Sequence, residues 1–165
     1  KTFQNAINKV VYERLTGESP ESFSNEWTER GHELEPVAIE AYELLTFNKV
    51  TRVGFIEFNE WIGCSPDGLV GESGMIQVKC PKFSTLIDYY LTDKIPADYY
   101  TQMQGELFVS GREFNEFYVF HPKLKPILKR VVRDEKHILE IRKKLEEAIE
   151  LVNERITKIQ KGVAL

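Results

Sequence analysis

Cysteine and histidine are scarce in this sequence, and their scarcity excludes the common soft-metal sites. The two cysteines, Cys64 and Cys80, cannot supply a four-cysteine zinc or iron–sulfur site. The three histidines are not paired at ligand spacing, so a zinc hydrolase is poorly supported. So few cysteines suit a protein that works in a reducing cytosol.

Long apolar runs are also absent. No stretch approaches the ~18 apolar residues of a membrane span, and no secretory signal pattern opens the chain. We therefore expect a cytoplasmic protein that does not bind membranes. The net charge of −4 gives no bulk attraction to nucleic acid. It does not exclude an enzyme that meets phosphates through metal ions, because metal-binding carboxylates lower the net charge.

The 165 residues suffice for one ordinary domain with a real core, and no internal repeat divides them. Helical periodicity covers residues 2–15, 27–46, 83–91, 97–109 and 134–160, with a stop at Gly17, a loop at 18–25 and a proline inside the second helix at Pro36. Strand patterns cover residues 50–58, 61–64 with 68–70 as its continuation, 75–80, 117–121 and 127–132. This order predicts an α/β fold with a central mixed sheet flanked by helices. The last helix is long and amphipathic, and packing on its own domain is favoured over a subunit interface.

The stretch CSPDGLVGESGMIQVKCP, residues 64–81, carries the chemistry. Side chains alternate across a strand, so Gln77 and Lys79 share one face while Ile76 and Val78 take the other. A core face explains the second pair but not an amide beside an ammonium. Asp67, in a turn entering the neighbouring strand, could reach the same spot.

These residues could form part of a Mg²⁺ site. Mg²⁺ prefers oxygen ligands, usually one or two carboxylates with waters and substrate phosphates. Asp67, the side-chain oxygen at position 77 and the backbone carbonyl of Val78 would make half a shell. Lys79 could orient or deprotonate the attacking water, and Glu35 could reach a second metal position. By spacing alone the interpretation is weak, because Pro-Asp is also an ordinary turn.

Four blocks of the sequence together resemble the lambda exonuclease and YqaJ-type viral recombinase family of PD-(D/E)XK nucleases. They are RGHELEP (30–36), GCSPDG (63–68), IQVKCP (76–81) and TQMQGELFVSG (101–111). The resemblance implies a restriction-endonuclease-like core over residues 1–165. In this family pattern an upstream helical segment bears an Arg for the 5′ phosphate, and the sequence begins at Lys1 after that point. We therefore expect part of the pattern to be missing, or the anchor to come from elsewhere.

The resemblance also implies roles for individual residues. Asp67 would be the metal-binding aspartate, Lys79 the catalytic lysine and Glu35 the helix glutamate that assists the metals. Gln102 matches the glutamine on the helix beside the active site. Gln104 lies about 200° from it around the helix, so only one of the two can face the metals. We expect Gln102 to do so and Gln104 to be structural.

The activity implied is that of a Mg²⁺-dependent deoxyribonuclease with two metal ions, in which Mn²⁺ substitutes. Its substrate would be linear double-stranded DNA, resected from the 5′ end to leave 3′ single strands for an annealing protein during phage-type recombination. The family further implies a ring-shaped homo-oligomer, a trimer in the best-known member, and a phage or prophage origin in a bacterial cell.

Position 77 departs from the family, which has Glu there. Gln has nearly the same shape but no charge, and only one of its terminal atoms is an acceptor. An engineered change and natural variation explain it equally well; in the second case Gln77 ligates weakly or a nearby acid such as Glu72 compensates. Two other functions therefore stay open: an endonuclease of the same fold, and a catalytically inactive DNA-binding member.

Overall fold

The structure of the chain is a computed structural model, which describes residues 2–19 and 26–163. It separates into two compact units, Ser24–Ile138 and a second made of Lys1–Phe23 with Leu139–Leu165. Each unit is described by itself. Residues 20–25 of the expected loop lie outside the described residues, and the single domain expected from the sequence stays a prediction.

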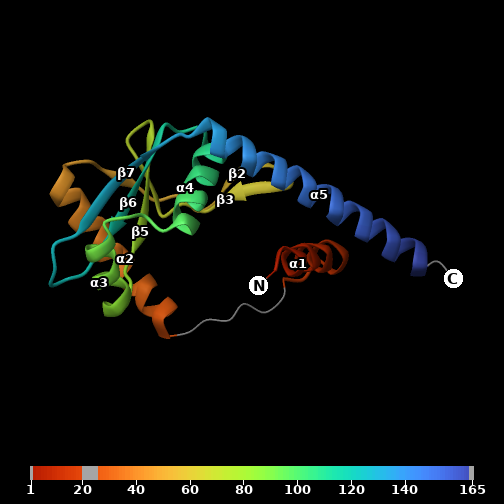
Figure 1. The fold of residues 1–165 in the computed structure, drawn as a ribbon, viewed down its shortest axis with the longest axis horizontal. Coiled ribbons are helices and arrows are strands. Elements are labelled where there is room, and N and C mark those ends of the chain that lie inside the picture. Colours follow the sequence, from red (N-terminus) through yellow and green to blue (C-terminus); the bar gives the residue numbers. More distant parts are fainter. Residues whose placement is uncertain (1, 20–25, 164–165) are drawn as a thin grey trace. The chain divides into compact units, whose positions relative to one another are not determined.

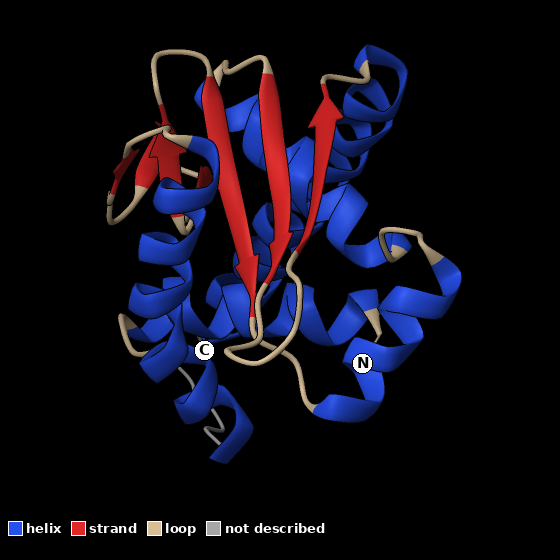
Figure 2. Ribbon diagram, turned by 90° about the vertical axis from the view of Figure 1, so that its left-hand side faces the viewer, coloured by secondary structure: helices blue, strands red, loops and turns tan. Residues whose placement is uncertain are grey.

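The first unit is built on a five-stranded sheet with the order β1-β4-β5-β6-β7. Its strands are Val50–Thr51, Gly68–Val70, Gly74–Lys79, Phe114–Val119 and Ile127–Val132. Strands β5 and β6 run parallel and all other neighbours antiparallel, so the sheet is mixed. The three longest strands lie side by side in Figure 2. The predicted fold class is therefore confirmed.

Helices cover both faces of this sheet (Figures 1 and 2). Because side chains alternate along a strand, each face of β5 and β6 has its own apolar set. One face packs on α2 (Glu26–Thr46) through a cluster of Ala38, Ile39, Tyr42, Val70, Ile76, Val78, Tyr118 and Phe120. The other packs on α3 (Phe83–Thr92) and α4 (Ala97–Ser110) through Leu86, Met103, Phe117, Val119 and Val131.

The expectation of one strand over residues 50–58 is wrong. Strand β1 ends at Thr51, the chain bends at Gly54, and β2 (Ile56–Asn59) pairs with β3 (Ile62–Cys64) in a separate two-stranded sheet. The apolar residues of the segment are thus divided between two sheets, which a strand pattern by itself does not reveal.

Two other strand boundaries also differ from the prediction. Strand β4 is not a continuation of β3, because the two belong to different sheets on either side of Pro66, which lacks an N–H for a ladder. Strand β6 begins at Phe114 and ends at Val119, whereas residues 117–121 were expected. Its first half was missed because the buried Asn115 and Glu116 are polar.

The second unit contains α1 (Phe3–Thr16) and most of α5 (Glu135–Val163). Helix α1 stops as predicted at Gly17, whose φ of 73° is left-handed and whose N–H bonds to the Glu13 carbonyl. Arg155 on α5 donates hydrogen bonds to Asn8 and Gln4 on α1. No helix in the described parts of the chain is both long and apolar enough to cross a bilayer.

A buried polar group fixes α2 on the sheet. The Tyr42 hydroxyl donates to Glu116 on β6, and Arg130 on β7 donates to the same carboxylate from Nε at 3.0 Å and from Nη2 at 2.6 Å. Burial and the Glu116 carboxylate raise the pKa of Tyr42 to about 12, so the hydroxyl keeps its proton. Tyr42 follows Glu35 by seven residues, about two turns of the helix, so this anchor sets the face on which Glu35 lies.

A matched pair of tyrosines tests the anchor. We expect Tyr42→Phe to lower the free energy of unfolding by about 2 kcal/mol, because a hydrogen bond to a charged group is lost and Glu116 stays buried. Tyr118, in edge contact with Tyr42 at 5.4 Å, is also fully buried, and its hydroxyl has no hydrogen-bond partner among the described residues. Tyr118→Phe is therefore expected to be neutral or stabilising by up to about 1 kcal/mol. Urea unfolding of both variants measures the difference, and equal losses would contradict it.

Candidate active site

The predicted site residues meet on the face of the sheet that is covered by α4. Gln77 and Lys79 both project from β5 toward this helix: Gln77 Oε1 accepts from Gln102 Nε2 at 2.7 Å, and Lys79 Nζ lies 4.7 Å from the centroid of the Tyr99 ring. Ile76 and Val78 lie in the α2 cluster on the opposite face. The alternation predicted from the sequence is therefore confirmed.

Asp67 joins this group at the entrance to β4. Its Oδ2 accepts from Gln77 Nε2 at 2.5 Å and from the Val78 N–H at 2.7 Å. Continuing the β4–β5 register by two residues would place Pro66 opposite Val78. Pro66 has no N–H to give to the Val78 carbonyl, so the β4–β5 ladder ends here. The Val78 carbonyl is left on the same side of β5 as its N–H, which donates to Asp67. The break at proline is thus what brings Asp67 to β5.

Opposing effects act on the pKa of Asp67. Burial raises the pKa of this carboxyl above its ordinary value, and the charge of Glu35 adds to the rise. The Val78 N–H, Lys79 and Gln77 oppose it. A buried carboxylate with a second carboxylate nearby favours a cation between them.

Glu35 is placed near this group from α2. Its carboxylate is close enough to act on the pKa of Asp67, and it pairs with Arg52 at 3.8 Å. Both members of this pair are partly open to solvent, so the pair is weak and Glu35 stays available for other cations.

Two residues of the site, Glu106 and Asn115, were not predicted from the sequence. Glu106 on α4 is 4 % exposed; its Oε1 accepts from Gln102 Nε2 at 2.8 Å and its Oε2 from Asn115 Nδ2 at 2.7 Å. Burial raises the pKa of Glu106, and the hydrogen bonds from Gln102 and Asn115 oppose the rise. The available signal was an acid four residues after Gln102 in an otherwise apolar helix segment.

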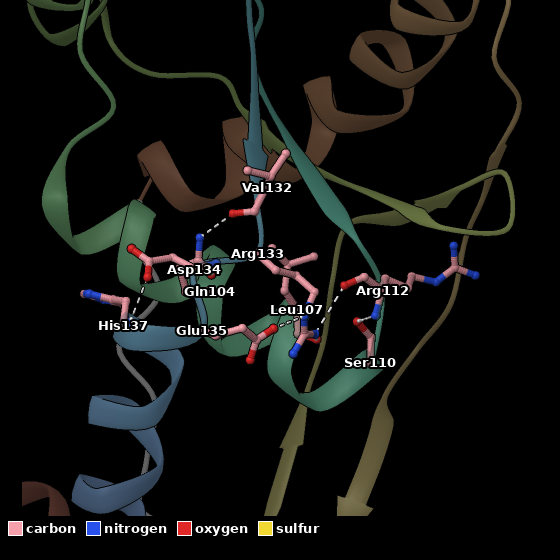
Figure 3. Close-up of polar contacts among 9 residues, drawn as sticks. All are labelled: Gln104, Leu107, Ser110, Arg112, Val132, Arg133, Asp134, Glu135 and His137. Carbon is pink, nitrogen blue, oxygen red and sulfur yellow. Dashed lines mark hydrogen bonds and ion pairs between the residues drawn. The ribbon is translucent and has the colours of Figure 1, made fainter.

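Gln104 lies away from the site, as expected for a structural residue. Its Nε2 donates to the Val132 carbonyl at 2.8 Å, and its Oε1 accepts from the Asp134 N–H at 2.9 Å (Figure 3). Asp134 in turn caps α5, because its Oδ1 accepts from the His137 N–H. Gln104 therefore ties α4 to the end of β7 and the start of α5.

The oxygens suited to a hard cation come from three groups of the described residues. No three His, Cys, Asp or Glu side chains in the described ranges form a group that could hold a metal ion. Among the described residues, both hydrogen bonds to Asp67 reach Oδ2, which leaves Oδ1 for a cation, together with the Val78 carbonyl and the Glu35 carboxylate. Gln77 does not fit, because its amide nitrogen faces Asp67 and its oxygen faces Gln102.

Comparison with known families and structures identifies the family of the chain. The family described as the YqaJ-like viral recombinase domain matches residues 3–113. The chain belongs to this family. No curated protein is significantly similar to the chain.

Three solved structures similar to this YqaJ-family chain are described as exonucleases. An alkaline exonuclease, LHK-Exo, from Laribacter hongkongensis has 32% sequence identity and a TM-score of 0.91, covering 98% of this chain and 84% of its own. Its complex with dAMP gives 33% identity, a TM-score of 0.92 and coverages of 98% and 85%. A phage-related exonuclease from Haemophilus somnus 129PT, at 19% identity and a TM-score of 0.72 over 94% and 83%, shares the fold. The resemblance drawn from the sequence is confirmed.

Proposed function

We propose that the chain is a divalent-metal-dependent nuclease that hydrolyses DNA phosphodiester bonds. The observation that carries the proposal is the meeting of Asp67, Lys79, Gln102 and position 77 in one partly buried group. That group lies in a chain with the fold of an alkaline exonuclease. We propose Mg²⁺ as the cofactor, with Mn²⁺ as a substitute, because the candidate ligands are oxygens.

Each residue has a separate task in this proposal. Asp67, the Val78 carbonyl and Glu35 would hold the cation, which polarises the scissile phosphate and its attacking water when bound. Lys79 is positioned by the Tyr99 ring, and it lies within electrostatic range of Asp67. It orients the water and offsets charge on the phosphate. Gln102 holds the side chain at position 77.

The finer assignment follows the family. The proposed substrate is linear double-stranded DNA, degraded from 5′ to 3′ to leave 3′ single strands for recombination. A single-strand annealing protein is the proposed partner, a homo-oligomer (a trimer) the proposed assembly, and the cytoplasm of a bacterial cell that carries a phage or prophage the proposed location. Support for these points is membership of the YqaJ-like viral recombinase family.

One observation favours a second candidate, a DNA-binding member that does not cleave. The Gln77 amide donates a hydrogen to Asp67 where the family's Glu would need a cation between two carboxylates. The amide thus satisfies Asp67 without metal. In this alternative the fold and the DNA surface are kept and the cation is lost.

Digestion of two DNA forms separates these functions. We expect 5′-phosphorylated linear duplex to be degraded as Mg²⁺ is titrated, while closed circular duplex of the same sequence stays intact, because an exonuclease needs an end. Release of acid-soluble nucleotides and gel mobility report the two results. Cutting of the circle would favour the endonuclease. Binding of linear duplex without degradation would favour the non-cleaving member.

A further inference from the structure

Glu106 is a buried carboxylate that the proposed mechanism does not use. It is 4 % exposed, and both groups that donate to it, the Gln102 and Asn115 amides, are neutral. Burying a carboxylate against neutral donors is costly compared with burying an apolar side chain. A residue retained at such a cost in the packing of α4 needs a reason.

A chain of hydrogen bonds links Glu106 to Asp67 through two amides, and Gln102 donates to both of its neighbours in the chain. Gln102 Nε2 donates to Glu106 Oε1 at 2.8 Å and to Gln77 Oε1 at 2.7 Å, so both of its hydrogens are used. Gln77 Nε2 then donates to Asp67 Oδ2. Both carboxylate oxygens of Glu106 accept hydrogen bonds, so Glu106 determines that the nitrogen of Gln102, and not its oxygen, faces residue 77.

Asn115 on β6 supports this orientation of the Gln102 amide by donating to Glu106. It is completely buried and its Nδ2 donates to Glu106, while its Oδ1 has no hydrogen-bond partner in the described part of the chain. An orphaned buried acceptor lowers stability. The polar contribution of Asn115 to the site is therefore its hydrogen bond to Glu106.

We propose that Glu106 is a positioning residue of the nuclease site. Its carboxylate fixes the Gln102 amide, which presents an N–H to the side chain at position 77 and holds that side chain against Asp67. The kinetic part of this inference rests on the proposed nuclease function. The orientation of the two amides does not.

Glu106→Gln tests the kinetic part, since the near-isosteric side chain has one acceptor oxygen for two donors. In the full chain carrying either Gln or Glu at position 77, we expect the turnover number on linear duplex to fall tenfold or more, with KM unchanged within twofold. Gln104→Met is the matched control: it removes two hydrogen bonds from another buried position of α4, outside the site. The control should lower the melting temperature and leave the turnover number unchanged. Equal turnover numbers in the two variants would reduce Glu106 to a structural residue.

NMR of side-chain amides tests the orientation without catalysis. In the unaltered chain we expect the NH₂ signals of Gln102 and Gln77 to be protected from hydrogen exchange. Glu106→Gln should shift both pairs and remove their protection, and Gln104→Met should leave them in place. Asn115→Ser, which frees the other side of Glu106, should give a smaller shift of the same signals. Unmoved Gln77 signals would overturn the inference. If neither Gln nor Glu at position 77 gives cleavage, the proposed nuclease function is overturned. The NMR signals then decide by themselves whether Glu106 positions the two amides.

Discussion

Replacing Gln77 by Glu is expected to increase Mg²⁺-dependent degradation of linear duplex by about 10²- to 10³-fold, because a correctly placed cation contributes several kcal/mol to the transition state. In the present chain the Gln77 nitrogen lies 2.5 Å from Asp67 Oδ2 and gives it a hydrogen. A Glu oxygen at that place has no hydrogen to give. Asp67 and Glu at position 77 then need a cation between them, and the site acquires the ligand that it lacks.

The same substitution is expected to make stability depend on metal. Two unit charges about 4 Å apart near a protein surface repel by about 4 kcal/mol, and these two would be closer. Without metal, Gln77→Glu should therefore lower the melting temperature by roughly 8–16 °C. Mg²⁺ should restore it, and should change the melting temperature of the Gln77 chain much less. This readout does not require cleavage.

Gln77→Met is the control for this experiment. It keeps the approximate length of the side chain but provides neither a hydrogen for Asp67 nor an oxygen for a cation, so neither the increase in cleavage nor the Mg²⁺-dependent rise in melting temperature should appear. If the unaltered chain already degrades DNA as fast as the Glu variant, position 77 is not a ligand and another oxygen must complete the site. If the Glu variant gains metal-dependent stability but no cleavage, the non-cleaving function moves ahead.

Lys79→Met, made in the Gln77→Glu chain, is expected to slow cleavage roughly 10³-fold with little change in DNA affinity. The Met side chain keeps the apolar stem of Lys79 over Tyr99 and removes only the ammonium, which lies in electrostatic range of both Asp67 and Glu106. The fold should therefore remain intact. Single-turnover cleavage under saturating enzyme, with the dissociation constant measured separately, separates chemistry from binding.

Lys82→Met is the matched control for the lysine. Lys82 is an exposed residue three positions further along the chain, just before α3, and it carries the same charge. Its removal should weaken DNA binding slightly, through general electrostatics, and leave the single-turnover rate unchanged. Equal rate losses at both positions would mean that Lys79 acts by charge alone.

The sequence alone determined the helices and much of the site chemistry. Periodicity is a local property, so α1, α3, α4 and α5 were placed within a few residues of their ends. Strand alternation put Gln77 and Lys79 on one face, and helical geometry separated Gln102 from Gln104. The order of the motifs identified the family, because SPDG and VKCP are short contiguous segments that can be recognised without knowing how the chain folds.

Only the tertiary structure decided which strands pair and which buried polar groups meet. The segment 50–58 is divided between two sheets, and β6 was shortened in the prediction because Asn115 and Glu116 look like solvent-facing residues. Their partners, Glu106 and Tyr42, lie on the helices α4 and α2, so no local sequence pattern predicts the contacts. The orientation of Gln77 likewise depends on Glu106, Gln102 and Asp67 together. Hydrogen-bond direction is a property of the assembled network, and it exists only after β5 and α4 have packed.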